Sequence, residues 1–266
     1  SDTYDPNDLG FLYNNNSRSY RGEVSWNAFV PSKYFYRRSA EFSFYYEELY
    51  KPQLYNISYL KLAIGGLHKK QLYTRLSLEA SPFGEVNHFE SREFGKEVIY
   101  EPGARVRWFF TSDYSKRFAL DGRMSYGKRF GVNQDAYQFG LMPRVRISDR
   151  MNVRLESSLE FIHNDYGYVS ILDDTYSDQI ILGVRDRTIV ENSLYTEFIF
   201  TKRMGLDLRL RHYWQEVNYK NFLTLLDEGE MRNSDYNPLQ EDGTSSHNTS
   251  YNAFTIDLSY TWVFLP

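Results

Sequence analysis

Charged side chains recur at every second position of several apolar stretches, and they are the residues of this sequence best placed to do chemistry. Arg105 and Arg107 are separated by one apolar residue, as are Arg144 and Arg146. Residues two positions apart on a β-strand share a face, so each pair presents two guanidinium groups to one side. The charged residues with this phase are Arg105, Arg107, Asp121, Arg123, Arg144, Arg146, Arg154, Glu156, Glu160, Glu197, Asp207, Arg209, Arg211 and Asp257.

Two interpretations of this charged face are open. In the first, neighbouring strands bring opposite charges together as cross-strand ion pairs that line the lumen of a barrel, each stabilising by roughly 0.2–1 kcal/mol. We favour this structural role, because small barrels fill their interiors with side chains. In the second, the face lines a passage for anionic solutes. Its attracting cluster would be Arg105, Arg107, Arg144 and Arg146.

Paired carboxylates offer a second kind of chemistry. Glu156 with Glu160, or Glu47 with Glu48, could flank a glycosidic bond in the way that a glycosidase requires. Adjacent arginines should instead keep these acids ionised, which removes the proton donor of such a reaction. We therefore expect no catalytic residues and no enzymatic activity.

Metal and cofactor sites have weaker support. Asp173, Asp174 and Asp178, in the same segment as Asp165, could hold calcium through carboxylate oxygens. The segment lacks the ordered spacing of a calcium loop, so we favour a solvated acidic loop. The histidines are scattered without ligand spacing, and the absence of cysteine excludes thiolate metal sites and disulfides. We expect no metal and no cofactor.

Composition narrows the classes of partner. The net charge of −4 gives no indication of nucleic-acid binding. Aromatic residues make up 18% of the chain, and the mean hydropathy is −0.60. This polarity is compatible with a lipid bilayer as partner, since a membrane-spanning strand exposes only alternate side chains to lipid. Other outer-membrane or surface proteins are further candidate partners, and a glycan or small-molecule ligand is not identified.

Unusually long strands would position the charged residues. Phe254, Ile256, Leu258, Tyr260 and Trp262 alternate with small or polar residues. A soluble strand typically has about 5–6 residues, whereas one that crosses a bilayer at a tilt of about 45° needs about 9–11. Alternation and turn residues predict about eleven such strands. They cover 17–30, 35–50, 54–67, 71–80, 101–111, 117–130, 135–148, 151–163, 188–201, 204–219 and 251–264.

The predicted connections alternate between two kinds. Every second connection of an up-and-down sheet lies at the same end, and outer-membrane barrels place short turns at the periplasm and long loops outside. The predicted turns at one end are all short, namely 31–34, 68–70, 112–116, 149–150 and 202–203. The connections at the other end are 51–53, 81–100, 131–134, 164–187 and 220–250, and three of these five are long. This sorting favours an outer-membrane location.

Aromatic residues near the strand ends are candidates for the girdles that mark the two membrane surfaces of such barrels. The principal candidates are Trp108, Tyr126, Trp214 and Trp262. His212, which precedes Tyr213 and Trp214, is expected at an interface for the same reason.

These features predict a single all-β domain over residues 1–266, an antiparallel up-and-down transmembrane β-barrel. Bacterial barrels normally have an even number of strands, and an open sheet edge cannot face hydrocarbon. We therefore expect a partial barrel whose missing strands lie beyond one or both ends of the sequence. Residues 1–6 have no basic region followed by an apolar core, so no signal peptide is expected within the sequence.

Several segments carry a resemblance to a known family. They are Asn7–Phe11, the stretch from Val190 to Phe222, which includes Glu191–Phe198, Lys202–Trp214 and Val217–Phe222, and the ending Asn252–Asp257 with Trp262–Pro266. The chain resembles the C-terminal barrel of a Bacteroidota family in which a carbohydrate-binding family-9-like domain precedes an outer-membrane barrel of unassigned function. The resemblance implies location and architecture, and it implies at least one further strand after Phe264.

Three hypotheses about function follow. The first is an integral outer-membrane, porin-like barrel that acts as a passage in transport or as a surface-facing platform linked to glycan capture. The second is a plugged scaffold subunit whose long loops bind another outer-membrane protein. The third is a soluble β-protein that binds or cleaves carbohydrate, which strand length and loop sorting disfavour.

Overall fold

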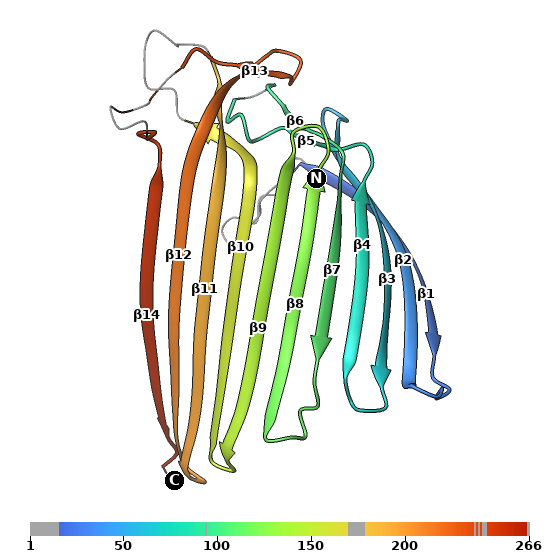
Figure 1. Cartoon of the computed structure of the whole chain (residues 1–266), viewed down its shortest axis with the longest axis vertical. Coiled ribbons are helices and arrows are strands. Elements are labelled where there is room, and N and C mark those ends of the chain that lie inside the picture. Colours follow the sequence, from blue (N-terminus) through green and yellow to red (C-terminus); the bar gives the residue numbers. More distant parts are fainter. Residues whose placement is uncertain are drawn as a thin grey trace.

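The protein folds into one antiparallel β-sheet, shown in Figure 1. The computed structural model describes residues 16–93, 95–169, 179–236, 238, 240 and 244–264. These residues form 14 strands and no helix. Across the described ranges, therefore, no helix has the length and apolar character needed to cross a bilayer.

Eleven of the strands are long and correspond one to one to the predicted strands. They are β1 (Ser17–Ala28), β2 (Phe35–Leu49), β3 (Tyr55–His68), β4 (Tyr73–Ser81), β7 (Gly103–Thr111), β8 (Phe118–Arg129), β9 (Gln134–Ser148), β10 (Met151–Val169), β11 (Ile181–Thr201), β12 (Met204–Leu225) and β14 (Thr249–Trp262). Their lengths run from 9 residues in β4 to 22 residues in β12. The all-β antiparallel fold is confirmed.

The structure corrects the upper ends of three strands. β10 ends at Val169, β11 begins at Ile181 and β12 ends at Leu225, so much of the predicted loop 164–187 is strand. A bulge explains the difference. The β10–β11 register shifts between Ile162 and Asp165, which changes the phase of the alternation and ends the sequence pattern too early.

Three strands of 3 residues each were not predicted: β5 (Glu85–Asn87), β6 (Val98–Tyr100) and β13 (Met231–Asn233). β5 pairs with β3 and β6, and β13 pairs with the far end of β12. Such short segments cannot show a period-2 pattern. They lie inside the connections that were predicted as the loops 81–100 and 220–250.

The sheet is open. Strands consecutive along the chain are neighbours in the order β1-β2-β3-β4-β7-β8-β9-β10-β11-β12, and β14 lies on the other side of β12 from β11. Within the described residues β1 pairs only with β2, and β14 only with β12, which places these two strands at opposite edges (Figure 1). The described chain is thus an open sheet and not a closed barrel.

The two faces of the sheet have opposite character. The strand register aligns apolar residues into rows on one face, such as Val24, Phe42, Leu62, Leu78, Val106 and Tyr126 across six strands. This apolar face is uncovered: Leu62 is 52% exposed and Leu258 is 66% exposed. No second layer of described residues packs on it.

The buried core lies at one end of the sheet instead. Val98, Tyr100, Tyr166, Ile180, Leu182 and Leu225 form one buried cluster, and Val169, Ile181 and Phe222 form another. We call this end the cap. It comprises β5, β6, β13, their flanking loops and the upper ends of β10, β11 and β12 (Figure 1).

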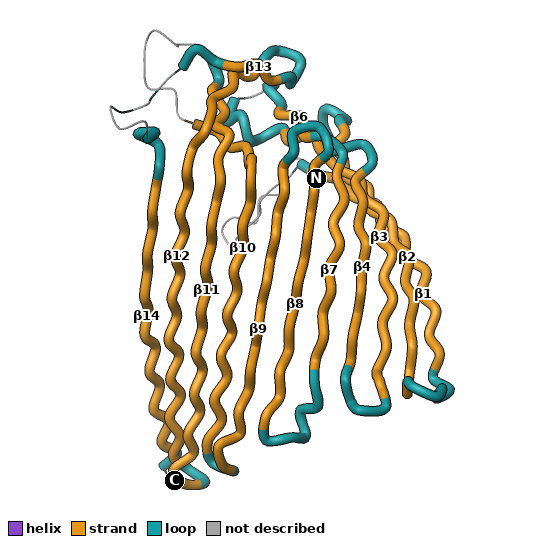
Figure 2. Tube along the Cα trace, viewed as in Figure 1, coloured by secondary structure: helices purple, strands orange, loops and turns teal. Residues whose placement is uncertain are grey.

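Figure 2 shows how the connections sort. The turns between β1 and β2, β3 and β4, β7 and β8, β9 and β10, and β11 and β12 lie at the end opposite the cap. The connections that contain β5 and β6, or β13, lie at the cap end. The predicted separation of short turns from long connections is confirmed for the described residues.

Candidate functional site

The strand register places all fourteen of the predicted charged residues on the face opposite the apolar rows. Arg144, for example, is directly opposite Arg154, which is opposite Tyr195, which is opposite Arg209 and then Asp257. This polar face is concave, because one of its cavities is lined by residues from both β4 and β10, which three strands separate.

Two of the cavities on the polar face are lined by the predicted charged residues. The cap-side cavity has a volume of about 350 Å³ and is lined by Glu79, Arg105, Arg129, Glu160 and Asp165, among others. The turn-side cavity has a volume of about 620 Å³ and is lined by Tyr114, Arg144, Arg154, Tyr195 and Arg209, among others. The arginines expected to form one attracting cluster are therefore divided, with Arg105 in the cap-side cavity and Arg144 and Arg146 in the turn-side cavity.

Ion pairs dominate around the cap-side cavity. Arg107 donates to both carboxylate oxygens of Glu79, at 3.0 and 3.3 Å. Arg129 binds Glu85 at 2.9 Å, which ties β8 to the short strand β5 of the cap. These side chains are partly exposed, so each pair stabilises by no more than about 1 kcal/mol. In the lining of this cavity Lys128 and Arg129 are ion-paired, whereas Arg105 forms no ion pair among the described residues.

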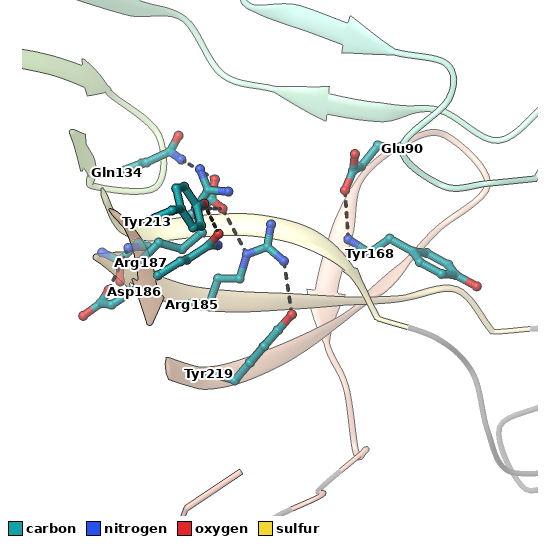
Figure 3. Close-up of polar contacts among 11 residues, drawn as sticks. Glu90, Gln134, Tyr168, Arg185, Asp186, Arg187, Tyr213 and Tyr219 are labelled. Carbon is teal, nitrogen blue, oxygen red and sulfur yellow. Dashed lines mark hydrogen bonds and ion pairs between the residues drawn. The ribbon is translucent and has the colours of Figure 1, made fainter. Parts of the chain in front are cut away.

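Asp165 is the centre of a second set of ion pairs at the cap end. Arg185 contacts its carboxylate at 3.0 Å and Arg187 at 3.1 Å, while Gln134 donates to it at 3.2 Å. Arg185 also donates to the Tyr219 hydroxyl at 3.1 Å (Figure 3). Two arginines therefore occupy one oxygen of the Asp165 carboxylate and Gln134 occupies the other.

The turn-side cavity has a different electrostatic character. Arg154 and Arg209 stack on the ring of Tyr195, with guanidinium carbons 4.3 and 5.1 Å from its centroid. Arg154 has a carboxylate partner, Glu156, at 3.3 Å. Among the described residues, Arg144, Arg146 and Arg209 form no ion pair.

Tyr114 and Arg117, on the turn between β7 and β8, fix the basic side of this cavity. Tyr114 donates to Asp121 and carries Arg144 on its ring, 4.7 Å from the centroid. Arg117 donates to the carbonyl oxygens of Arg146 at 3.1 Å and of Ile147 at 2.8 Å. Asp121 therefore orients Tyr114 and forms no ion pair with Arg144 or Arg146.

Sequence reasoning missed Tyr114, Lys116, Arg117 and Tyr195 as lining residues of the turn-side cavity. Tyr195 has the phase of the polar face, and this was the available signal. No such signal exists for Tyr114, Lys116 and Arg117, because the alternation of a strand does not predict the position of the turn that follows it.

The candidate carboxylate pairs are engaged in other contacts. Glu156 faces Arg154, and Glu160 lines the cap-side cavity. Glu47 accepts hydrogen bonds from Tyr45 and from Asn56, the latter at 3.1 Å. Glu48 contacts Arg18 at 3.5 Å and accepts from Gln53 at 3.1 Å. These contacts make Glu47, Glu48 and Glu156 ion-pair or hydrogen-bond acceptors.

Of the four girdle candidates, Trp262 alone ends a strand, at the turn end of β14. Tyr126 is near the cap end of β8, where its ring is tilted against that of Tyr137 with the centroids 5.0 Å apart. Trp108 pairs with Met124, two residues from Tyr126, and the same register row reaches Trp214 in the middle of β12. His212, one row from Trp214, bonds Asn192 at 3.3 Å.

The described residues contain no group of three or more histidine, aspartate or glutamate side chains arranged to hold a metal. The calcium candidates Asp173, Asp174 and Asp178 lie outside the described residues.

Contacts within the cap hold its loops to the strands. The Tyr168 amide donates to Glu90 at 2.9 Å (Figure 3), and Lys96 forms an ion pair with Asp227. This pairing lowers the pKa of the Asp227 carboxyl and raises that of the Lys96 amine. Burial lowers the pKa of His247, whose ring hydrogen-bonds the Tyr236 hydroxyl at 2.7 Å. The cap is a packed structure and not a set of separate loops.

Comparison with known proteins gives one match. No curated protein and no solved structure matches the chain. One family model, described as "Domain of unknown function (DUF5916)", matches residues 1–266. The chain belongs to this family.

Proposed function

We propose that the sheet is the wall of an outer-membrane β-barrel, with lipid against its apolar face and the polar face toward the lumen. The observation that carries the proposal is the exposure of the apolar rows across the whole sheet, while both clusters of buried apolar side chains lie in the cap. A protein in water buries such a face against a second layer, since large exposed apolar patches are rare on soluble monomers. No described residues supply that layer.

The height of the apolar face supports a bilayer. Exposed apolar residues run from Phe254 to Trp262 on β14 and from Phe118 to Tyr126 on β8. Each run spans nine residues, or about 27 Å along the strand at about 3.4 Å per residue. A tilted transmembrane strand needs about 9–11 residues, so the runs have the required length.

The aromatic residues support the same orientation. Tyr126 and Tyr137 lie near the cap ends of β8 and β9, and Trp262 lies at the turn end of β14. Girdles of this kind flank the apolar band of outer-membrane barrels. The cap would then face the cell exterior and the short turns the periplasm.

Closure of the barrel requires strands between the edges β14 and β1. No described strand pairs with the outer side of either edge, and unpaired backbone groups cannot remain in hydrocarbon. We infer that further strands of the same polypeptide fill this gap, with a partner chain as the alternative.

Within this architecture, the protein acts as a passage or as a surface-facing platform. The unpaired arginines of the turn-side cavity favour a path for solutes, while the packed cap favours a plugged scaffold subunit that binds another outer-membrane protein. The link to glycan capture is implied only by the resemblance. A soluble carbohydrate-binding protein is the least supported, because it leaves the apolar face in water.

Conductance of the complete protein in planar bilayers tests the passage. Discrete ion-conducting steps, lost when the protein is omitted, are the expected result. A complete, membrane-inserted barrel that never conducts would exclude the passage and leave the scaffold function, which is tested by co-purification of partners from native membranes. Recovery of the same partners after deletion of 226–248 would count against the scaffold function.

A further inference from the structure

The turn-side cavity carries an excess of positive charge that the sheet does not neutralise. Its lining includes six basic residues, Lys116, Arg117, Arg144, Arg146, Arg154 and Arg209, and three acidic residues, Glu197, Asp207 and Asp257. Asp257 is engaged with Arg211 at 2.9 Å, outside the lining. Arg144 and Arg154 are also direct cross-strand partners, a like-charge pairing that destabilises a sheet in the absence of an anion.

Most basic residues of the cavity are separated from the acidic ones, and Arg209 of β12, directly opposite Asp257, is the exception. Lys116, Arg117, Arg144 and Arg146 come from the β7–β8 turn and from β9, whereas the acidic residues come from β11, β12 and β14. One side therefore offers guanidinium and ammonium donors, which suit a carboxylate or phosphate. The other side offers carboxylate acceptors, which suit hydroxyl donors.

The arginines are held in place before any ligand arrives. Arg144 is stacked on Tyr114, whose hydroxyl is held by Asp121, and Arg154 and Arg209 share the Tyr195 ring. Stacked guanidinium groups retain their donors while losing less freedom on binding. The cavity volume of about 620 Å³ is within the range of small-molecule sites.

We propose that the turn-side cavity binds a small hydroxylated organic anion, a sugar acid or a sugar phosphate, with the anionic group on Arg144 and Arg146 and the hydroxyls toward Glu197 and Asp207. This inference goes beyond the passage-or-platform proposal. It requires an accessible polar face but no open path through the barrel, so a barrel that fails to conduct does not overturn it.

Calorimetric titration of the complete protein in detergent tests the site, with D-glucuronate and glucose 6-phosphate as the two anionic arms. Glucose and inorganic phosphate are the matched probes that lack the charge or the hydroxyls. Saturable binding of at least one anionic arm, about tenfold or more tighter than either matched probe, is expected. Affinity should fall several-fold on raising salt from about 0.05 to about 0.5 M.

Paired variants locate the site. Arg144→Gln with Arg146→Gln should weaken binding by about tenfold or more, the value for lost charged hydrogen bonds. Arg107 is paired with Glu79 near the cap-side cavity. Arg107→Gln should therefore change the binding affinity by less than about twofold. Circular dichroism verifies that each variant retains its strand content, and Arg144→Lys tests whether charge alone restores affinity.

Two results would overturn the inference. One is the absence of saturable binding by both anionic arms at concentrations up to tens of millimolar. The other is binding that the double variant leaves unchanged or that Arg107→Gln weakens equally. Since none of these measurements involves a bilayer, they remain separable from the conductance and membrane-insertion experiments.

Discussion

Leu258→Arg separates a lipid-facing surface from a water-facing one. Leu258 lies midway between Phe254 and Trp262 on β14, pairs with Leu208 of β12, and is 66% exposed. An arginine on the lipid face costs about 2–4 kcal/mol at the bilayer midplane and about 0–1 kcal/mol near the interfaces. The free energy of unfolding should therefore fall by about 3 kcal/mol, roughly a hundredfold in the folding equilibrium.

The assay is reversible guanidinium unfolding of the complete protein in lipid vesicles, followed by tryptophan fluorescence. Ser259→Arg is the matched control, because Ser259 is the next residue, lies on the opposite face and is directly opposite Asp207. It should alter stability by no more than about 1 kcal/mol. Phe254→Arg should cost less than Leu258→Arg, since it lies nearer the interface. Equal costs at all three positions, or none at Leu258, would refute the reasoning.

Three other outcomes are expected elsewhere in the chain. Leu182→Ala, in the fully buried centre of the cap, should destabilise the cap by about 2–5 kcal/mol; unchanged hydrogen exchange there would contradict the assigned core. Gly84→Ala would place a Cβ 2.1 Å from the Tyr100 carbonyl oxygen at a φ of 70°, and should cost roughly 1–3 kcal/mol in urea unfolding. Gly205→Ala, 3.9 Å from its nearest neighbour, should cost less than about 0.5 kcal/mol, and equal costs would count against this packing. Burial lowers the folded-state pKa of His247 below its usual 6.5, so the unfolded chain takes up the proton first. The cap should therefore lose stability as the pH falls through about 6.5. Hydrogen exchange from about pH 8 to pH 5 should show this loss of stability, and His247→Gln should abolish it.

The eleven long strands could be predicted because alternation is a local property of the sequence. Each strand carries its own period-2 pattern, and the structure retains the predicted phase wherever the ladder is regular. The pattern failed at Asn164, where a φ of 53° and a register shift interrupt the alternation. The cap was not predicted, since its short strands form through contacts between segments that are far apart in the chain.

The division of the charged face could not be predicted, because it depends on register and on side-chain direction. Glu79 is directly opposite Arg105 on the neighbouring strand, yet its carboxylate binds the diagonal Arg107. Arg144 is opposite Arg154, so two like charges meet where a ladder of ion pairs was expected. Sequence identifies which residues share a face, and only the pairing of strands shows which charges are neutralised.

The most direct test of the proposed orientation identifies whether lipid or water contacts each face of β8. A fluorescent label on single cysteines at the apolar positions 120 and 124, and at the polar-face positions 121 and 125, would be measured in vesicles against brominated lipids and aqueous iodide. We expect quenching by brominated lipid at 120 and 124, and by iodide alone at 121 and 125. Iodide quenching at 120 and 124, or protection of these positions from both quenchers, would show that water or a second protein layer covers the apolar face.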